Sequence, residues 1–288
     1  MLYLKLKNTF SELFLDTVVV NAFLFFRNGK VLHRNWGDDI NYYFLTELFR
    51  KNIVCYDYSP LSHRLNKPNY LVIGSSITLL CNNKSIVWGS GVIDPEQEIP
   101  GKPRDVLAVR GPLTRKYLLD RGIPCPEVYG DPALLLPLVY KPQVKKKYKL
   151  GVVPHYSDFN SPVLDNLRDQ EGTLMIKMEG YEKWTDVIDQ INMCECVVSS
   201  SLHGLIVAEA YGVPARWICV ENNLLGGNFK FWDFYESIEK YNMLPLQVDN
   251  FTSISTLYNE ARSCQKGKLD LQPLINSCPF KIFHGFVE

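Results

Sequence analysis

The stretch that decides the fold is residues 196–220, CVVSSSLHGLIVAEAYGVPARWICV. Its first residues, 196–198, form a short apolar and β-branched run that is typical of a buried strand. Apolar residues then recur at helical spacing over 202–211, and Gly212-Val213-Pro214 predicts the end of that helix. A second apolar run at 215–220 predicts another strand. Strand, helix and strand in this order predict an α/β fold with a parallel sheet.

The same alternation runs through the rest of the chain. Short apolar runs predict strands at 18–26, 53–56, 70–73, 86–88, 106–109, 150–153 and 174–177. Helical spacing predicts helices at 40–49, 112–119 and 184–193, and amphipathic surface helices at 229–239 and 254–264. Between 138 and 149 lie Pro142 and four lysines (145, 146, 147 and 149), which are typical of a solvated linker. We therefore predict two Rossmann-like domains, 1–140 and 141–288.

Length and composition exclude several classes of protein. A chain of 288 residues exceeds the usual size of a single core. Its 31 basic and 31 acidic residues give no net charge, which argues against a dedicated nucleic-acid binder. The most apolar stretch, 13–26, is interrupted by Asp16 and Asn21 and is too short to span a bilayer. With no pattern of a secretory signal, the sequence predicts a cytoplasmic protein.

The cysteines give no sign of a metal centre. The eight residues form no CxxC pair, and several lie among apolar neighbours, where a free cysteine behaves as a small core residue. Cys194, Cys196 and His203 match no common zinc spacing. The sequence therefore predicts no metal.

The strongest candidate site is Ser199-Ser200-Ser201-Leu202-His203-Gly204. In open α/β sheets, ligands bind beyond the carboxyl ends of the strands, and a helix start favours an anion. Here three hydroxyls and an imidazole fall at one strand-to-helix turn, and Gly204 would allow a close backbone approach. In the alternative interpretation, the serines cap the helix and His203 is a hydrogen-bonded structural residue.

Four other strand ends carry polar groups: Asn35-Trp36-Gly37-Asp38, Trp88-Gly89-Ser90-Gly91, Val109-Arg110-Gly111-Pro112 and Pro154-His155-Tyr156. The guanidinium of Arg110 could present a planar fork to a phosphate or carboxylate, or it could pair with a nearby acidic side chain. The Gly-x-Gly of the second motif lacks the third glycine of a dinucleotide fingerprint, so it gives little support for NAD binding. No P-loop, GxSxG elbow or HExxH helix is present.

In sequence order, six motifs resemble the polysaccharide pyruvyl transferase family, and most closely its bacterial exopolysaccharide and capsule branch. The motifs are Asn35-Trp36-Gly37-Asp38, Trp88-Gly89-Ser90-Gly91, Arg110-Gly111-Pro112, Gly130-Asp131-Pro132, Pro154-His155-Tyr156 and Ser201-Leu202-His203-Gly204. The resemblance covers residues 35–235. It implies a two-lobed, GT-B-like arrangement with the active site between the domains, the first on the acceptor side and the second on the donor side.

The resemblance also implies a reaction. The enolpyruvyl group of phosphoenolpyruvate would be transferred to two hydroxyls of a sugar, forming a cyclic ketal and releasing phosphate without a metal or other cofactor. Because an imidazole can hold a proton near neutral pH, His203 is the expected general acid. Arg110 is expected to bind the donor's phosphate or carboxylate, and Asp38 to act as a base or a ligand of the acceptor hydroxyl, unless it only caps its helix.

One position departs from the family pattern. Many members have an arginine directly before Leu-His, where this chain has Ser201. One anion contact is therefore expected either to be lost or to be supplied by Lys230 or Arg216. The complete set of residues expected to bind substrate is Asn35, Gly37, Ser90, Gly91, His155, Ser200, Ser201, Leu202, Gly204 and Lys230.

Two other functions fit the same fold. One is a GT-B-type glycosyltransferase that uses a nucleotide sugar, and the other is a non-catalytic saccharide-binding protein. The expected partners of the pyruvyl transferase are phosphoenolpyruvate and a sugar or lipid-linked oligosaccharide, with no nucleic acid. A lipid-linked acceptor would place the protein at the inner face of the membrane, in contact through surface aromatic residues and lysines 145–149.

Overall fold

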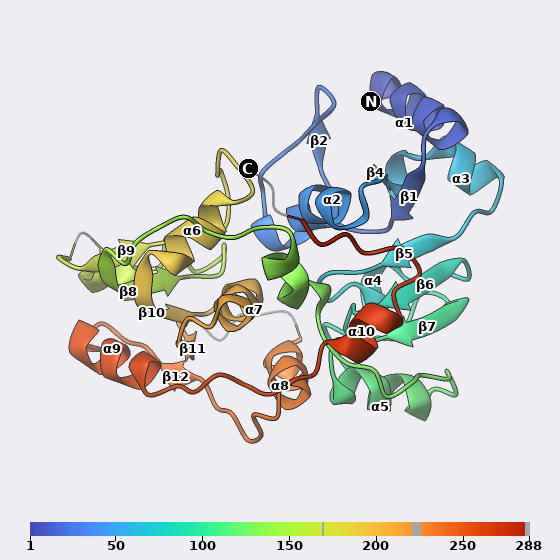
Figure 1. The fold of residues 1–288 in the computed structure, drawn as a ribbon. Helices are drawn as coiled ribbons and strands as arrows, with labels where there is room; N and C mark the ends of the chain where they lie inside the picture. Colours follow the sequence, from blue (N-terminus) through green and yellow to red (C-terminus); the bar gives the residue numbers. More distant parts are fainter. Residues whose placement is uncertain (169, 221–225, 286–288) are drawn as a thin grey trace.

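Two parallel sheets of five strands form the centres of the two halves of the chain (Figure 1). The computed structural model describes residues 1–168, 170–220 and 226–285. The first sheet contains β1 (Thr17–Val20), β4 (Asn52–Cys55), β5 (Asn69–Leu71), β6 (Ser85–Trp88) and β7 (Asp105–Ala108). The second contains β8 (Tyr148–Val153), β9 (Thr173–Met175), β10 (Cys194–Ser199), β11 (Ala215–Cys219) and β12 (Leu246–Gln247). The α/β class predicted from the sequence is confirmed, and the two parallel sheets are consistent with two Rossmann-like domains.

Both sheets have the same strand order. The first runs β4-β1-β5-β6-β7 and the second runs β12-β11-β10-β8-β9. When the strands are numbered within each half, both read 2-1-3-4-5, a doubly wound order in which the ligand crevice lies between strands 1 and 3. That crevice falls between β1 and β5 in the first half and between β8 and β10 in the second. The topology therefore marks two strand pairs as the places to look for a site.

The helices cover both sheets. Those of the first half are α1 (Leu2–Phe14), α2 (Trp36–Phe49), η1 (Tyr56–Tyr58), α3 (Pro60–Arg64), α4 (Ile77–Leu80), α5 (Pro112–Asp120) and η2 (Pro132–Leu138). Those that follow are η3 (Pro162–Leu167), α6 (Asp186–Asn192), α7 (Leu202–Tyr211), α8 (Phe229–Ser237), α9 (Ile254–Arg262) and α10 (Gln272–Asn276). None of the described helices has the length and apolar character needed to cross a membrane.

Helix α7 begins and ends at the residues predicted from its sequence. Gly212 follows it in the left-handed conformation, with φ of 69°, as expected for a glycine that ends a helix. The helix packs on η2 of the first half. One continuous apolar cluster includes Phe44 of α2, Leu135 of η2 and Ile206 of α7. The two halves are thus joined by a shared core, which fixes the strand ends of one sheet against those of the other.

Two predicted elements differ in the structure. The strand predicted over 18–26 ends at Val20, because the Asn21 side chain turns inward and donates to the Leu80 carbonyl at 2.8 Å. The chain then forms a small hairpin of β2 (Phe26–Arg27) and β3 (Lys30–Val31). The predicted surface helix at 229–239 is the mostly buried helix α8, which packs on α5 of the first half.

The end of the chain also departs from the predicted division. The prediction placed all of 141–288 in the second domain, but the tail returns to the first sheet. There the Leu274 carbonyl accepts a hydrogen bond from the Trp88 indole at 3.0 Å, and Phe280 packs on Phe49. The backbone N–H of Phe283 donates to the Leu48 carbonyl at 2.9 Å. The apolar side chains of this tail cover part of the first half, a long-range contact that no local pattern indicates.

Candidate active site

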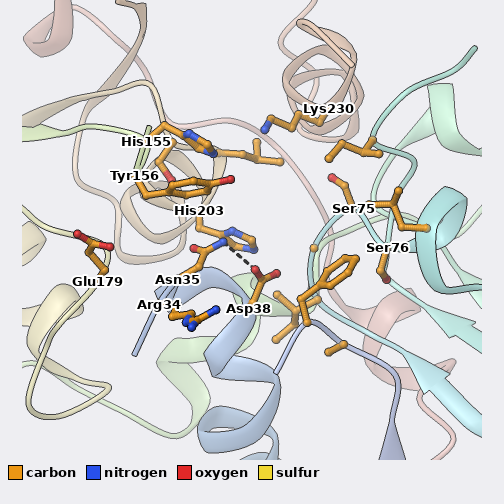
Figure 2. Close-up of a pocket in the computed structure, with 18 of the residues that line it drawn as sticks. Arg34, Asn35, Asp38, Ser75, Ser76, His155, Tyr156, Glu179, His203 and Lys230 are labelled. Carbon is orange, nitrogen blue, oxygen red and sulfur yellow. Dashed lines mark hydrogen bonds between the residues drawn. The ribbon is translucent and has the colours of Figure 1, made fainter. Parts of the chain in front are cut away.

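A cavity of about 620 Å³ lies between the two halves and is lined by residues of both (Figure 2). Its first-half wall includes Phe23, which follows β1, and Ser75, which follows β5. Its second-half wall includes His155, which follows β8, and His203, which follows β10. These are the four strand ends that flank the two crevices. The cavity is therefore where a doubly wound sheet on each side would hold a ligand.

His203 lies in the first turn of α7 and faces this cavity (Figure 2). Its ring packs directly on the backbone of Gly37, since a Cβ added there would lie 2.0 Å from His203 Nδ1. The Nε2 atom is shielded from solvent and has no hydrogen-bond partner among the described residues. An unpaired polar atom in a cavity wall is costly unless a ligand satisfies it.

The protonation of His203 differs from the sequence-based expectation. Burial lowers its pKa to about 3, and the charges of Lys230 and Arg110 act in the same direction. The imidazole in this structure is therefore neutral at ordinary pH. A neutral ring with a free Nε2 is suited to accept a proton or to hydrogen-bond a ligand.

Asp38 is positioned by the start of α2. Asn35 caps this helix by accepting from the Gly37 N–H at 3.2 Å, and its Nδ2 donates to Asp38 Oδ2 at 2.8 Å (Figure 2). Asp38 is thus not the capping residue. Burial raises its pKa to about 7, and the neighbouring Asp39 charge adds to this effect. This carboxyl group can hold a proton near neutral pH.

His203 and Asp38 meet at the same backbone segment. A Cβ added to Gly74 would lie 3.8 Å from Asp38 Oδ1 and 4.0 Å from His203 Cε1. Gly74 has φ of +97°, in the region that favours glycine. One titratable group from each half of the molecule therefore reaches the same side of the cavity.

Two cationic side chains line the cavity in the part of the chain that the structure describes. The Lys230 ammonium enters from α8 and forms no hydrogen bond or ion pair with the residues that the structure describes; burial and the Arg110 charge lower its pKa to about 8. Arg34 is exposed and lies over the Phe25 ring, with its Cζ 4.8 Å from the ring centroid. Arg216, the other expected replacement cation, instead pairs with Glu260 at 3.4 Å and does not line the cavity.

Arg110 lies behind the wall of the cavity. Its side chain is fully buried, and its Nε donates to Asp233 Oδ2 at 2.9 Å. Its Nη2 donates to the Val92 carbonyl at 2.8 Å, and its Nη1 donates to the Ser75 hydroxyl. The alternative interpretation, an arginine paired with a nearby carboxylate, describes this geometry. Arg110 supports the cavity by holding Ser75, and direct contact with a donor stays a prediction.

The three serines before His203 have different surroundings. The Ser199 hydroxyl donates to the Val153 carbonyl at 2.8 Å, and the Ser200 hydroxyl donates to Asp158 Oδ2 at 2.6 Å. Ser200 also accepts from the His155 N–H at 2.9 Å, which holds the β8 turn beside the β10 turn. Only the Ser201 hydroxyl lines the cavity, and no described residue hydrogen-bonds to it. Ser201 is the position where many family members have arginine.

The structure separates the predicted site residues into two groups. Those that line the cavity are Asn35, Asp38, His155, Ser201, Leu202, His203 and Lys230. Those that lie behind it are Gly37, Ser90, Gly91, Arg110, Ser200 and Gly204. The glycines of the second group allow close packing; a Cβ at Gly91 would lie 2.4 Å from Arg110 Cζ. Whether the lining residues bind substrate stays a prediction.

The sequence analysis missed part of the wall. The missed residues are Phe23, Phe25, Arg34, Gly74, Ser75, Ser76 and Glu179, among others. Arg34 directly precedes the Asn35 motif, so a cation beside a helix cap was a signal that could have identified it. Ser75 and Ser76 follow the short strand β5, where two hydroxyls after a glycine were the available signal.

Comparisons with known proteins identify one matching family model and two similar proteins. The family model described as polysaccharide pyruvyl transferase matches residues 6–220. The succinoglycan biosynthesis protein ExoV of Rhizobium meliloti (strain 1021) is 30% identical over 217 residues, which cover 72% of this chain and 62% of that protein. The uncharacterized protein L143 of Acanthamoeba polyphaga mimivirus is 25% identical over 252 residues, which cover 82% of this chain and 86% of that protein.

Proposed function

We propose a function from one premise: the chain belongs to the polysaccharide pyruvyl transferase family. The family and the enzyme class predicted from the six motifs are thereby confirmed. The proposed reaction transfers the enolpyruvyl group of phosphoenolpyruvate to two hydroxyls of a sugar, forms a cyclic ketal and releases phosphate. The proposed setting is exopolysaccharide biosynthesis, the process named for the similar ExoV protein.

The observation that carries the proposal is the set of unsatisfied polar groups in one cavity. The Lys230 ammonium and the Ser201 hydroxyl face it with no hydrogen bond or ion pair to a described residue, and His203 Nε2 is buried without a partner among those residues. Ser201 makes no side-chain cap to α7, so the first N–H groups of that helix add to the positive potential. A small donor with a carboxylate and a phosphate requires such cations and N–H groups.

The two halves would divide the substrates in a GT-B-like manner. The donor lies against the second-half wall, where Lys230 and Ser201 supply positive charge and hydrogen bonds. The acceptor sugar lies against the first-half wall, near Phe23 and Phe25. Apolar ring faces suit the C–H faces of a pyranose, and Arg34 can donate to its hydroxyls. A cavity of about 620 Å³ is large enough for both reacting groups.

The chemistry requires one group that gives a proton and one that removes it. The methylene carbon of phosphoenolpyruvate takes a proton, and the first sugar hydroxyl adds to the neighbouring carbon and loses its own. Phosphate then leaves with the electrons of the bond that held it, and the second hydroxyl adds at the same carbon. Of the two hydroxyl protons, one balances the proton given to carbon and the other leaves on the phosphate.

We assign the proton donor to Asp38 and the proton acceptor to His203. This reverses the expectation from the sequence, because burial favours the neutral form of both groups. A neutral carboxyl group carries a proton to give, whereas a neutral imidazole has a lone pair to receive one. The negative charge of a bound donor raises both pKa values, which keeps Asp38 protonated to a higher pH.

The test is phosphate release from phosphoenolpyruvate with a panel of hexose acceptors and no added metal, followed by mass spectrometry. We expect release that requires a sugar, and a product whose mass gain is that of a pyruvate ketal. Lys230→Met should weaken donor use, whereas the control Lys116→Met, on the exposed face of α5, should not. Protection from thermal unfolding by a uridine diphosphate sugar, with no response to phosphoenolpyruvate, would instead identify a glycosyltransferase.

A further inference from the structure

Helix α1 (Leu2–Phe14) presents its apolar side chains to solvent. Six of them are more than half exposed: Leu2, Tyr3, Leu6, Phe10, Leu13 and Phe14. On a helix of 3.6 residues per turn they occupy one stripe about 120° wide. Figure 1 shows α1 at the edge of the first half, with α3 beneath it. A contiguous apolar surface of this kind marks a contact with another apolar phase or molecule.

The inward face of α1 is mostly polar, with Leu4 as its one buried apolar residue, which is the reverse of an ordinary surface helix. Glu12 accepts hydrogen bonds from the Ser59 and Ser62 hydroxyls, the latter at 2.5 Å, and pairs with Lys67 at 3.4 Å. Asn8 Nδ2 donates to the Tyr58 carbonyl at 2.9 Å. These bonds fix the rotation of the helix about its axis. The apolar stripe therefore faces outward because the polar residues of α1 are held inward.

The charges of α1 favour an anionic partner. Lys5 and Lys7 are exposed and lie on opposite edges of the apolar stripe. The only acidic residue of the helix, Glu12, is turned inward, and Asp16 beyond its end pairs with Lys51 at 2.6 Å. Apolar side chains bordered by lysines are the pattern of a helix that lies in the interface of an anionic bilayer. Two copies of this chain joined through the stripe would bring four lysines together without an acid to pair with them.

This face is connected to the mouth of the cavity. The β2–β3 hairpin turns at Gly29, where an added Cβ would lie 3.1 Å from the Tyr3 ring of α1. The residue before β2, Phe25, is exposed and lines the cavity, and Arg34 lies over its ring. Figure 1 shows the hairpin beside α1 at the same end of the molecule. A partner bound to the apolar stripe of α1 would therefore lie near the acceptor side of the cavity.

We propose that the outward face of α1 binds the surface of an anionic phospholipid bilayer and orients the cavity toward a saccharide carried there on lipid. The membrane contact does not depend on the proposed reaction; only the lipid-linked acceptor rests on it. The contact differs from the one predicted through lysines 145–149. Of these, Lys146 donates to the Cys194 carbonyl and is held against the second sheet.

Cosedimentation of the full chain with vesicles tests this inference without any donor or acceptor. We expect binding to vesicles of phosphatidylcholine and phosphatidylglycerol, and little binding to phosphatidylcholine alone. Leu6→Gln/Phe10→Gln should abolish binding, because it removes the apolar stripe while glutamine preserves the helix. Its control is Leu244→Gln/Phe251→Gln, two exposed apolar residues of the second half, which should bind as wild type does.

The charge variants complete the test. Lys5→Gln/Lys7→Gln should weaken binding at least tenfold, since each lysine near an anionic surface contributes about fivefold. Lys145→Gln/Lys147→Gln removes the same charge elsewhere and should have no such effect. The inference is overturned if wild type stays in the supernatant with every vesicle, or if the control pairs lose binding equally. A dimer that Leu6→Gln/Phe10→Gln dissociates, with no vesicle binding, would assign the stripe to a second copy.

Discussion

Each half of the molecule contains a strand followed by a turn and a helix with a basic side chain, but that side chain has different hydrogen-bond partners in the two halves. In the first half, β7 leads through Arg110 to α5. In the second half, β10 leads through Ser201 to α7, with His203 in its first turn. Both turns place a basic side chain at the carboxyl end of a parallel strand, where a ligand is expected. The sequence marks both as candidate binding groups and favours the segment that contains His203.

The difference lies in how many hydrogen bonds the protein itself supplies. Arg110 is fully buried and donates to Asp233, Val92 and Ser75, so its guanidinium is occupied by the protein. His203 Nε2 is buried with no partner in the described part of the chain. Burying a polar group without a partner is costly, and a ligand in the cavity that paired with His203 Nε2 would remove that cost. We therefore expect Arg110 to act mainly on stability and His203 to act on activity.

The largest expected effect is a loss of activity when His203, which follows the turn between β10 and α7, is replaced. His203→Ala should lower turnover by about 10³-fold or more, because it removes a proton acceptor that the reaction requires. The melting temperature should stay close to that of wild type, since the lost Nε2 makes no hydrogen bond to any residue that the structure describes. Phosphate release and circular dichroism measure the two quantities. A well-folded and active His203→Ala enzyme would remove the residue from the mechanism.

At the first turn, the expected effect is on stability. Arg110→Met leaves Asp233 buried and without its cation, and losing one partner of a buried pair costs about 3–5 kcal/mol of unfolding free energy. Urea unfolding measures this cost. As a control, Lys116→Met breaks the exposed pair with Asp120, which should contribute less than about 1 kcal/mol. An Arg110→Met protein as stable as wild type would contradict a structural role.

A smaller loss of activity should follow from a change behind the cavity wall. Gly37→Ala places a Cβ 2.0 Å from His203 Nδ1, so the ring must move. A misplacement of about 1 Å can cost about 10²-fold in turnover. The control is Gly101→Ala. Gly101 does not line the cavity, and the nearest atom to the new Cβ is Asn82 Cα at 3.1 Å. Equal activities of the two variants would show that His203 needs no fixed position.

The smallest expected effect is the change of kcat/KM with pH, and its direction is defined. Asp38 must be protonated to give a proton, so kcat/KM should fall as pH rises through and above its pKa of about 7. Lys230, with a pKa of about 8, loses its charge in the same direction. His203 is already neutral above its pKa of about 3 and adds no rising limb near neutrality.

This profile distinguishes the two assignments of the proton donor and acceptor. In Lys230→Met, the fall should remain but move to higher pH, because the Lys230 charge lowers the pKa of Asp38. A rate that instead rises between pH 6 and 8 would identify a base that titrates near neutrality, contrary to the proposed roles. Initial rates over pH 5–9 at limiting donor concentration provide the measurement.

Much of the fold could be predicted because its signals are local. Helix α7 was predicted at its exact bounds, since its apolar run is bordered by serines and by Gly212. Parallel strands bring their carboxyl ends to one edge, so His155 and Ser201 could be expected in one cavity. These predictions needed only periodicity, turn residues and the geometry of parallel sheets.

The remainder depended on contacts between distant residues. Asp233 lies 123 residues from Arg110, and no local pattern indicates that the two pair. Burial of α8 follows from its contact with α5, and the return of the tail follows from the space it fills beside Phe49. The polar inner face of α1 likewise becomes visible only once Ser59 and Ser62 lie beneath Glu12. Composition and spacing cannot supply such pairings.

The central claim is that the phosphoenolpyruvate donor binds beside His203, at the turn between β10 and α7. The chain has five histidines, so nitrogen NMR of the labelled imidazoles follows this residue directly, with His203→Ala to assign its signals. We predict that phosphoenolpyruvate shifts the His203 Nε2 signal in a saturable manner and leaves His33, His63 and His284 unchanged. A His203 signal that does not respond to saturating phosphoenolpyruvate would contradict the claim.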